Sequence, residues 1–220
     1  YNGGVPKDEL ANENMEALKL GIVNLEKHIE NIQQFGVPVV VTLNKFASDS
    51  DDELKYVKEF CIKHNCEFAL SEVWEKGGEG AIDIANKIVE LANKNSNLNY
   101  MYELEDDIKT KILKVSTKIY GAKNVIYSKE AEEQIEKINL FGYSNLPICI
   151  AKTQYSFSDD PKNLECKNDY SINVKSVELK AGAGFIVVIA GNIMTMPGLP
   201  KIPAAENIDI DKDGNIIGLF

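Results

Sequence analysis

The segment from Val37 to Trp74 constrains the fold more than any other part of this chain. It begins with an apolar, mostly β-branched run that reaches Leu43 without polar alternation. Such a run is typical of a parallel strand that is covered on both faces. An acidic loop, a helical pattern over Asp51 to His64 and a short strand over Glu67 to Leu70 follow, so the segment predicts a βαβ unit.

Two aromatic side chains follow these two predicted strands. Phe46 comes shortly after Leu43, and Trp74, the only tryptophan, comes shortly after Leu70. In open α/β sheets, ligands bind beyond the carboxyl ends of the strands, so the two rings would lie at one edge and could clamp a flat heterocycle. The alternative is that each ring fills a gap in the hydrophobic core, as large aromatic side chains often do. The residues alone leave both interpretations open.

The rest of the chain continues the alternation of helices and strands. Helices are predicted over Leu10–Gln34, Ala81–Asn93, Glu105–Tyr120 and Lys129–Asn139, and strands over Pro147–Thr153, Val174–Leu179 and Phe185–Gly191. This order favours an α/β fold, with a mainly parallel sheet flanked by helices in three layers and a long N-terminal helix. The segment 194–203 is expected to be extended, and Asp209 to Phe220 a short hairpin.

Charge and cysteine content narrow the class of protein. The net charge is −10 and all 24 basic residues are lysines, which disfavours binding to nucleic acid or to anionic membranes. No apolar run is long enough to span a membrane, and no signal peptide is recognisable. The cysteines Cys61, Cys66, Cys149 and Cys166 show no CxxC spacing, which is typical of reduced, buried thiols in a cytoplasmic protein.

Two short motifs bear on nucleotide binding. Asn44-Lys45 is similar to the start of the NKxD element that reads guanine, but Ala47 stands where the aspartate is needed, which argues against a GTPase-like nucleotide binder. The Gly77–Gly80 segment precedes a predicted helix, where free amides can hold an anion. The chain contains no GxxxxGK[ST] loop, so a turn that shapes the surroundings of Trp74 is the better interpretation.

Three further groups of residues are candidates for a site. Asp209, Asp211, Asp213 and Gly214 match the start of an EF-hand loop, but Phe220 replaces the glutamate that calcium requires. Cys61, His64 and Cys66 would bind zinc only with a distant fourth ligand. The polar loop from Lys152 to Asp160 follows a predicted strand, so it would line a ligand cavity, contact another subunit or simply be solvated. No metal site is predicted.

Four separated blocks resemble, in order, the carboxy-terminal part of the formate–tetrahydrofolate ligase family. They are VPVVVTLNKFASDSDDEL, FALSEVWEKGGEGAIDIANKIVE, PICIAKTQYSFSDDP and GNIMTMPGLPKIPAAENIDID. The resemblance covers essentially all of the chain. It implies a part in the ATP-dependent joining of formate to tetrahydrofolate, which gives 10-formyltetrahydrofolate through formyl phosphate.

The resemblance also implies a folate-binding role for particular residues. Phe46 and Trp74 would sandwich the pterin ring, with Ala47 and Leu70 as neighbouring walls. The family commonly has proline where this chain has Ala47, so the wall is smaller and the loop looser here. No catalytic residue is carried over to this chain.

The family's ATP-binding phosphate loop, which works with Mg, lies upstream of the region matched here. We therefore expect a carboxy-terminal fragment that is inactive alone, with residues 1–35 as a junction turn and helix and 36–220 as the α/β domain that contributes the folate pocket. Expected partners are tetrahydrofolate, formate, ATP and the rest of its own chain, in a cytoplasmic homotetramer. The alternative is a noncatalytic α/β binding or assembly module, which a reading frame without GxxxxGK[ST] upstream of Tyr1 would favour.

Overall fold

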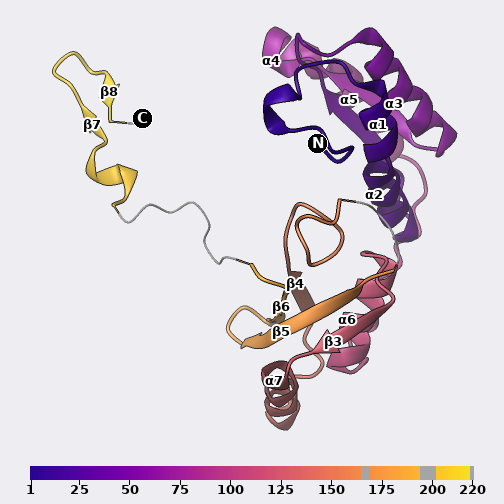
Figure 1. Cartoon of the computed structure of the whole chain (residues 1–220), viewed down its shortest axis with the longest axis vertical. Coiled ribbons are helices and arrows are strands. Elements are labelled where there is room, and N and C mark those ends of the chain that lie inside the picture. The colour runs from indigo at the N-terminus through magenta and orange to yellow at the C-terminus, as the bar shows by residue number, and fades with distance from the viewer. Residues whose placement is uncertain (165–168, 194–201, 219–220) are drawn as a thin grey trace.

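The computed structural model describes residues 1–164, 169–193 and 202–218 (Figure 1). Their strands form three separate sheets. One pairs β1 (Val40–Asn44) with β2 (Glu67–Ser71), and a small one pairs β7 (Asp209–Ile210) with β8 (Ile216–Ile217). The third has four strands in the order β3 (Asn124–Tyr127), β5 (Ser171–Lys180), β6 (Phe185–Ala190) and β4 (Ile148–Ala151). Parallel strand pairs flanked by helices confirm the predicted α/β class. The sequence pattern suggested a single sheet, whereas the strands of the described residues form separate ones.

The predicted βαβ unit is present. β1 (Val40–Asn44) and β2 (Glu67–Ser71) are parallel and are connected by α3 (Asp51–Lys63). The side chain of Ser50 accepts a hydrogen bond from the amide of Glu53, which caps the N-terminus of α3. The helix is followed by Asn65, at φ 54°, which turns the chain into β2.

The expectation that β1 is covered on both faces is wrong. Its residues are half-buried or exposed, and Thr42 and Asn44 are the exposed ones. The physical reason is that β1 has one neighbouring strand, β2, so a two-stranded sheet offers little cover. The apolar run nevertheless contributes to a core, because Val39, Val41 and Leu43 pack against it.

The N-terminal helical region is divided. A 3₁₀ turn, η1 (Lys7–Glu9), precedes α1 (Met15–Gly21) and α2 (Val23–Gln34), and the side chain of Asn14 caps α1 by accepting from the amide of Ala17. The helical pattern that begins at Leu10 in the sequence thus becomes helix only at Met15. The division between α1 and α2 follows Gly21, a poor helix former that packs closely on the N-terminal turn, where an added Cβ would lie 2.8 Å from the nitrogen of Gly3.

The first core lies among α2, α3, β1 and β2. Its buried members are Ile22, Ile29, Val57, Cys61, Cys66 and Phe68. After β2 come the single-turn helix α4 (Val73–Lys76), the 3₁₀ segment η2 (Gly77–Ala81) and α5 (Ile82–Ala92). This core contains residues from both sides of the domain boundary that the sequence analysis places between residues 35 and 36. The boundary itself stays a prediction.

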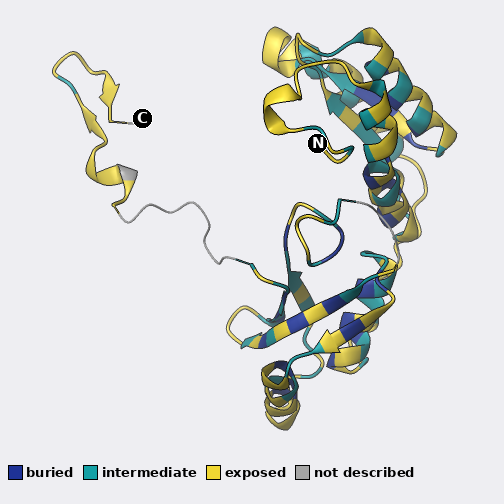
Figure 2. Ribbon diagram, in the orientation of Figure 1, coloured by how far each residue is buried: buried dark blue, intermediate teal, exposed yellow. Residues whose placement is uncertain are grey.

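The second core is built on the four-stranded sheet. The elements are α6 (Ile108–Lys118), β3 (Asn124–Tyr127), α7 (Lys129–Leu140), β4 (Ile148–Ala151), β5 (Ser171–Lys180) and β6 (Phe185–Ala190). β3 is parallel to β5 and β4 is parallel to β6, whereas β5 and β6 are antiparallel. The fully or nearly buried side chains along β5 and β6 alternate with more exposed ones (Figure 2), which is the pattern of strands with one well-covered face.

Helix α2 connects the two cores. The side chain of Asn31 donates a hydrogen bond to the carbonyl of Ile119, 2.9 Å away, and that of Asn24 donates to the carbonyl of Leu164, 3.1 Å away. Both asparagines are buried. Because a buried amide is stabilising only when it is hydrogen-bonded, these contacts fix α2 against the second part of the chain.

The C-terminal hairpin is confirmed over the residues that the structure describes. After η3 (Ala204–Glu206), β7 (Asp209–Ile210) and β8 (Ile216–Ile217) are antiparallel. The carboxylate of Asp211 accepts from the amides of Asp213 and Asn215, so this aspartate serves the turn itself. Most of the segment 194–203, predicted to be extended, lies outside the described residues, as does Phe220.

The thiols differ from the sequence-based expectation at one position. Cys61 and Cys66 are free and buried, as predicted, but Cys149 is free and exposed. The reason is that β4 is an edge strand, and the side chain of Cys149 lies on its open face. Cys166 lies outside the described residues.

Candidate functional site

The two predicted ring-bearing loops leave the same edge of the first sheet. β1 and β2 are parallel, and their last paired residues, Asn44 and Ser71, are opposite each other. The amide of Lys45 also donates to the carbonyl of Ser71 over 2.9 Å, which extends the pairing to the residue before Phe46. Parallel pairing therefore places both loops at the carboxyl ends of the strands, where α/β proteins bind ligands.

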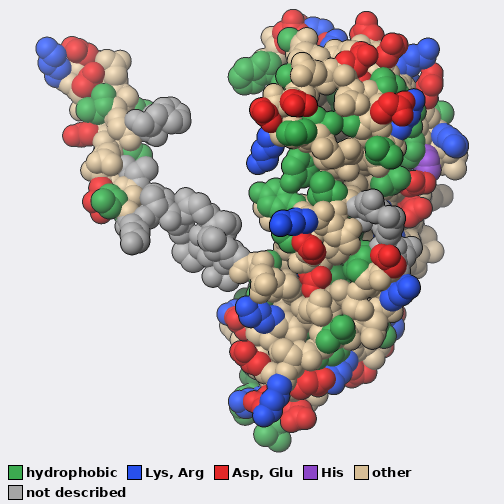
Figure 3. Space-filling model, in the orientation of Figure 1, with side chains coloured by type: hydrophobic (Ala, Val, Ile, Leu, Met, Phe, Trp, Pro, Cys, Tyr) green, Lys and Arg blue, Asp and Glu red, His purple; other side chains and the backbone are tan. Residues whose placement is uncertain are grey.

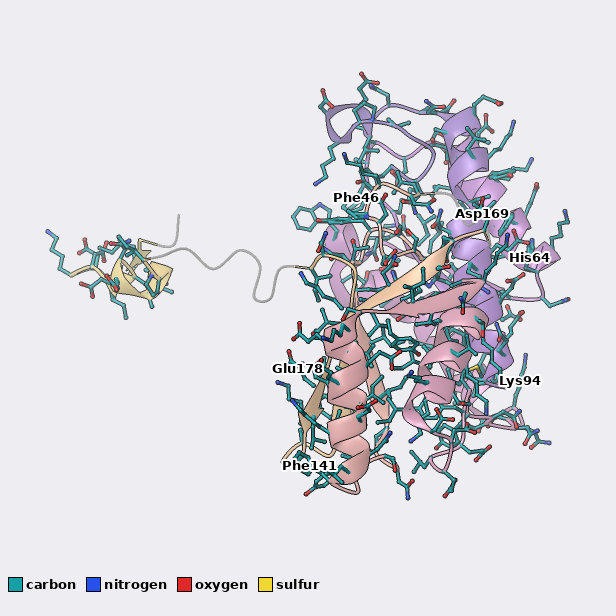
Figure 4. All side chains as sticks on the ribbon, turned by 60° about the horizontal axis from the view of Figure 1, so that its bottom comes forward. Phe46, His64, Lys94, Phe141, Asp169 and Glu178 are labelled. Atoms are coloured by element: carbon teal, nitrogen blue, oxygen red, sulfur yellow. The ribbon has the colours of Figure 1, made fainter. Side chains whose placement is uncertain are left out.

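Phe46 lies on the loop between β1 and α3 and is 54 % exposed. Its amide donates a hydrogen bond to Oδ2 of Asp49, 2.8 Å away, which fixes the backbone beneath the ring. Figure 4 shows the ring projecting away from the ribbon. The core-filling alternative does not apply to Phe46, because a ring exposed to this extent does not occupy the hydrophobic core.

Trp74 is more exposed still, at 87 %, and lies on the single turn of α4. Gly77 ends α4 with φ 59° and ψ −140°, a conformation that glycine adopts without strain. Among the ring contacts of the described residues there is no pair between Phe46 and Trp74. The two rings therefore project from one sheet edge without stacking on each other. Exposed apolar side chains are not confined to these two loops, since several groups of them are visible on the molecular surface (Figure 3).

The other two predicted wall residues differ in their surroundings. Leu70 is partly buried and packs against the first core, whereas Ala47 is exposed beside Phe46. Leu70 is thus held by the sheet, while Ala47 depends on its loop. A cavity of about 510 Å³ lies beside Val41 and Leu43, but neither Phe46 nor Trp74 lines it.

A charged cluster lies between the two loops. Oε1 of Glu72 is 3.6 Å from Nζ of Lys45, and Oε2 of Glu72 is 2.7 Å from Nζ of Lys76. The hydrogen bond from Lys76 lowers the pKa of Glu72, and the same bond raises the pKa of Lys76. Sequence reasoning missed this cluster, although the spacing of Glu72 and Lys76 by one helical turn was a visible signal.

The glycine-rich segment after Trp74 is a packed turn. The amide of Glu72 donates to the carbonyl of Gly80 over 3.1 Å, and a Cβ atom added at Gly80 would lie 2.4 Å from the carbonyl carbon of Glu72. Helix α5 begins after Ala81, and no side chain caps it. With Glu75 and Glu79 beside it, this segment does not fit the phosphates of ATP, since two carboxylates would repel them.

Residues Lys152 to Phe157 of the polar loop line a second cavity of about 320 Å³, together with residues of the N-terminal region and Tyr120. Nζ of Lys152 donates to the carbonyls of Thr153, Ser156 and Ser158 and lies 4.9 Å from the centre of the Tyr120 ring. Burial lowers the pKa of Lys152 to about 8. All three ammonium protons have backbone acceptors, so this lysine holds its own loop, and the site of the two rings lies on the other sheet.

Two observations concern classes of site outside the rings. Within the described residues, no group of three or more histidine, cysteine, aspartate or glutamate side chains is arranged to bind a metal ion. The helices in the same part of the chain include none with the length and apolar character required to cross a membrane. The exposed ring pair therefore remains the strongest candidate site of the described chain.

Comparison with known proteins shows the family of the chain. The family model described as formate–tetrahydrofolate ligase matches residues 1–220, which is the entire chain. The chain belongs to the formate–tetrahydrofolate ligase family. A curated relative, the formate–tetrahydrofolate ligase of Limosilactobacillus reuteri subsp. reuteri (strain JCM 1112), is 48 % identical over 221 residues.

The match covers 100 % of this chain but 40 % of that relative. The chain thus spans about two fifths of the length of the curated ligase that it matches. The family assignment accounts for the resemblance of the four sequence blocks.

Proposed function

We propose that this chain supplies the pterin-binding wall of a formate–tetrahydrofolate ligase. The proposed whole reaction is the ATP-dependent joining of formate to tetrahydrofolate, giving 10-formyltetrahydrofolate. The observation that carries the proposal is the pair of exposed rings, Phe46 and Trp74, on two loops that leave one sheet edge. Exposed rings on adjacent loops are suited to stacking on a flat heterocycle, and each stacked ring contributes on the order of 1 kcal/mol beyond the buried area.

The role of the chain in this proposal is positioning. Phe46 and Trp74 would contact opposite faces of the pterin, Leu70 would form a fixed wall, and Ala47 would form a small, adaptable one. Held in this way, the folate amine that accepts the formyl group is presented in one orientation, which raises the rate of a reaction between two bound groups. The sequence has no phosphate loop and the Gly77–Gly80 turn does not fit ATP, so no ATP or Mg step is assigned to these residues.

The same proposal covers the substrates and the assembly of the complete enzyme. The family assignment supports formate, tetrahydrofolate and ATP as the small molecules of the complete enzyme, and a cytoplasmic homotetramer remains our prediction for its assembly. We further propose that this part has no ligase activity alone. Activity of the isolated 220-residue chain with formate, ATP and tetrahydrofolate would contradict that statement.

The test of the folate site is fluorescence of Trp74 during titration with tetrahydrofolate, corrected for absorbance by the ligand. Because Trp74 is the only tryptophan, the signal has a single source. We expect saturable quenching that Phe46→Ala weakens about fivefold, which corresponds to the loss of one stacked ring. ATP should cause no saturable change.

Phe141→Ala is the matched control. Phe141 is also an exposed phenylalanine, at 64 %, but it follows α7 in the second part of the chain (Figure 4). It should leave the titration unchanged. Equal effects of the two substitutions, or no saturable quenching of the unsubstituted chain, would contradict the proposed site.

A further inference from the structure

One carboxylate joins the two loops that carry the rings. Glu72 contacts Lys45, the residue before Phe46, through one oxygen, and Lys76, on the helix of Trp74, through the other. The side chains of Glu72 and Lys45 are 25 % and 34 % exposed. Partial burial reduces the screening of such a contact by salt.

The backbone around Glu72 is fixed independently of its side chain. The amide of Glu72 donates to the carbonyl of Gly80, and the preceding residue, Ser71, accepts from the amide of Lys45. Gly80 packs so closely on Glu72 that a side chain has no room there. Glu72 therefore starts from a fixed position at the end of β2, and its carboxylate can hold the neighbouring loop.

The helix that carries Trp74 has little stability of its own. α4 consists of four residues, and no side chain caps its N-terminus. A single helical turn in water is unstable because its nucleation is costly and few hydrogen bonds offset it. The contact between Glu72 and Lys76, one turn apart, is thus positioned to support α4, while the contact with Lys45 ties it to the Phe46 loop.

We propose that Glu72 is a positioning residue that holds the Phe46 loop and the Trp74 helix at a fixed separation before a ligand binds. This inference rests on the proposed function for its consequence in folate binding, but the holding itself concerns the ligand-free chain. A preordered pair of loops loses less conformational entropy on binding a flat ligand, so the affinity rises without any direct contact between Glu72 and the ligand. An ordinary surface charge would have no such effect.

The first test is backbone hydrogen exchange of the ligand-free, 220-residue chain. Glu72→Gln keeps the shape of the side chain but removes its charge, and we expect the amides of Phe46 and Lys76, which lie in the two segments that Glu72 holds, to exchange about threefold faster. Glu79→Gln is the matched control. It removes the same charge from the neighbouring turn, where Glu79 makes no ion pair within the described part of the chain. Equal exchange in the two variants would overturn the proposal.

The second test is the tetrahydrofolate titration of the same variants, with Lys45→Met added. Glu72→Gln should weaken binding of tetrahydrofolate about threefold and Lys45→Met somewhat less, because Glu72→Gln also loses the contact with Lys76. The double variant should be no weaker than Glu72→Gln alone, because the contact that Lys45→Met removes is already absent there. Glu79→Gln should bind as the unsubstituted chain does. Additive effects would overturn the proposed pairing of Glu72 with Lys45.

The two tests separate this inference from the proposed function. If Glu72→Gln accelerates exchange while the unsubstituted chain fails to bind tetrahydrofolate, the holding role stands and the folate site is wrong. If tetrahydrofolate binds and Phe46→Ala weakens it, but exchange and binding are unaffected by Glu72→Gln, the folate site stands and the positioning role is wrong.

Discussion

The amide of Lys45 donates a hydrogen bond to the carbonyl of Ser71, one residue beyond the last paired position of β1. The bond keeps the two chain segments together up to the residue before Phe46. The aromatic ring of Phe46 is thus attached to the sheet through its own backbone, whereas the loop that leads from Phe46 to α3 is held by a different contact.

That contact is the hydrogen bond from the amide of Phe46 to Oδ2 of Asp49. In Asp49→Ala the acceptor is lost, so the loop samples more conformations and binding of tetrahydrofolate should weaken about threefold. The urea midpoint should change little, because the loop is exposed. Asp49→Asn retains an oxygen acceptor and should bind almost normally. The interpretation fails if the alanine and asparagine variants bind equally well.

The packing of Gly80 against Glu72 gives a second prediction. In Gly80→Ala the new methyl group would lie 2.5 Å from the carbonyl oxygen of Glu72, so the turn after Trp74 must shift. We expect the free energy of unfolding to fall by about 2 kcal/mol, the cost of overpacking a close contact. Urea denaturation measures this change, and the quenching of Trp74 by tetrahydrofolate should weaken as well.

Gly78→Ala is the control for that prediction. Gly78 lies in the same turn, but a Cβ atom added there has no neighbour within 4 Å. It should leave both the unfolding free energy and the titration nearly unchanged. A Gly78→Ala variant as impaired as Gly80→Ala would indicate that flexibility of the turn, and not its packing on Glu72, is what matters.

Local patterns were sufficient to predict the βαβ unit. The apolar run before Asn44, the Ser50 cap and the helical spacing of Leu54, Val57 and Cys61 all act within a few residues, and the structure has strand and helix at those places. Parallel pairing is then a consequence of the helix between the strands, which brings the loops of Phe46 and Trp74 to one edge. The role of those rings was inferred from the resemblance and is still a prediction.

Features that depend on distant partners were not predictable in the same way. β3 was not predicted because only two of its four residues, Val125 and Ile126, are aliphatic, and its pairing with β5 is what makes the segment a strand. The exposure of Cys149 depends on which strand lies at the sheet edge. The contact of Lys45 with Glu72 exists only because β1 and β2 pair in register, which the sequence does not reveal.

The second core should be sensitive to loss of volume at Ile112. This side chain lies on α6 and is fully buried among the hydrophobic residues of the four-stranded sheet. We expect Ile112→Ala to lower the free energy of unfolding by about 3 kcal/mol, because it removes buried methyl groups and leaves a cavity. Ile126→Ala on β3, at a side chain that is 53 % exposed, should cost less than about 0.5 kcal/mol in the same urea experiment. Similar losses would show that the sheet face carrying Ile126 is covered in solution.

Alkaline pH should destabilise the first core through its buried thiols. Burial raises the pKa of Cys61 from 9.0 to about 11 and also raises the pKa of Cys66. Between pH 9 and 11 the folded chain therefore keeps a proton that the unfolded chain has lost, and the free energy of unfolding falls as the pH rises. A rise of this size in the pKa of one thiol corresponds to about 3 kcal/mol.

Urea denaturation at several pH values checks this prediction through the slope of stability against pH. Cys61→Ala also removes a buried sulfur atom, so its stability is lower at every pH, but its alkaline slope should be shallower than that of the unsubstituted chain. Cys149→Ala, at an exposed thiol, should keep the full slope. If Cys61→Ala and Cys149→Ala lose stability with equal slopes, the buried thiols of the first core do not govern the alkaline transition, and groups elsewhere in the chain do.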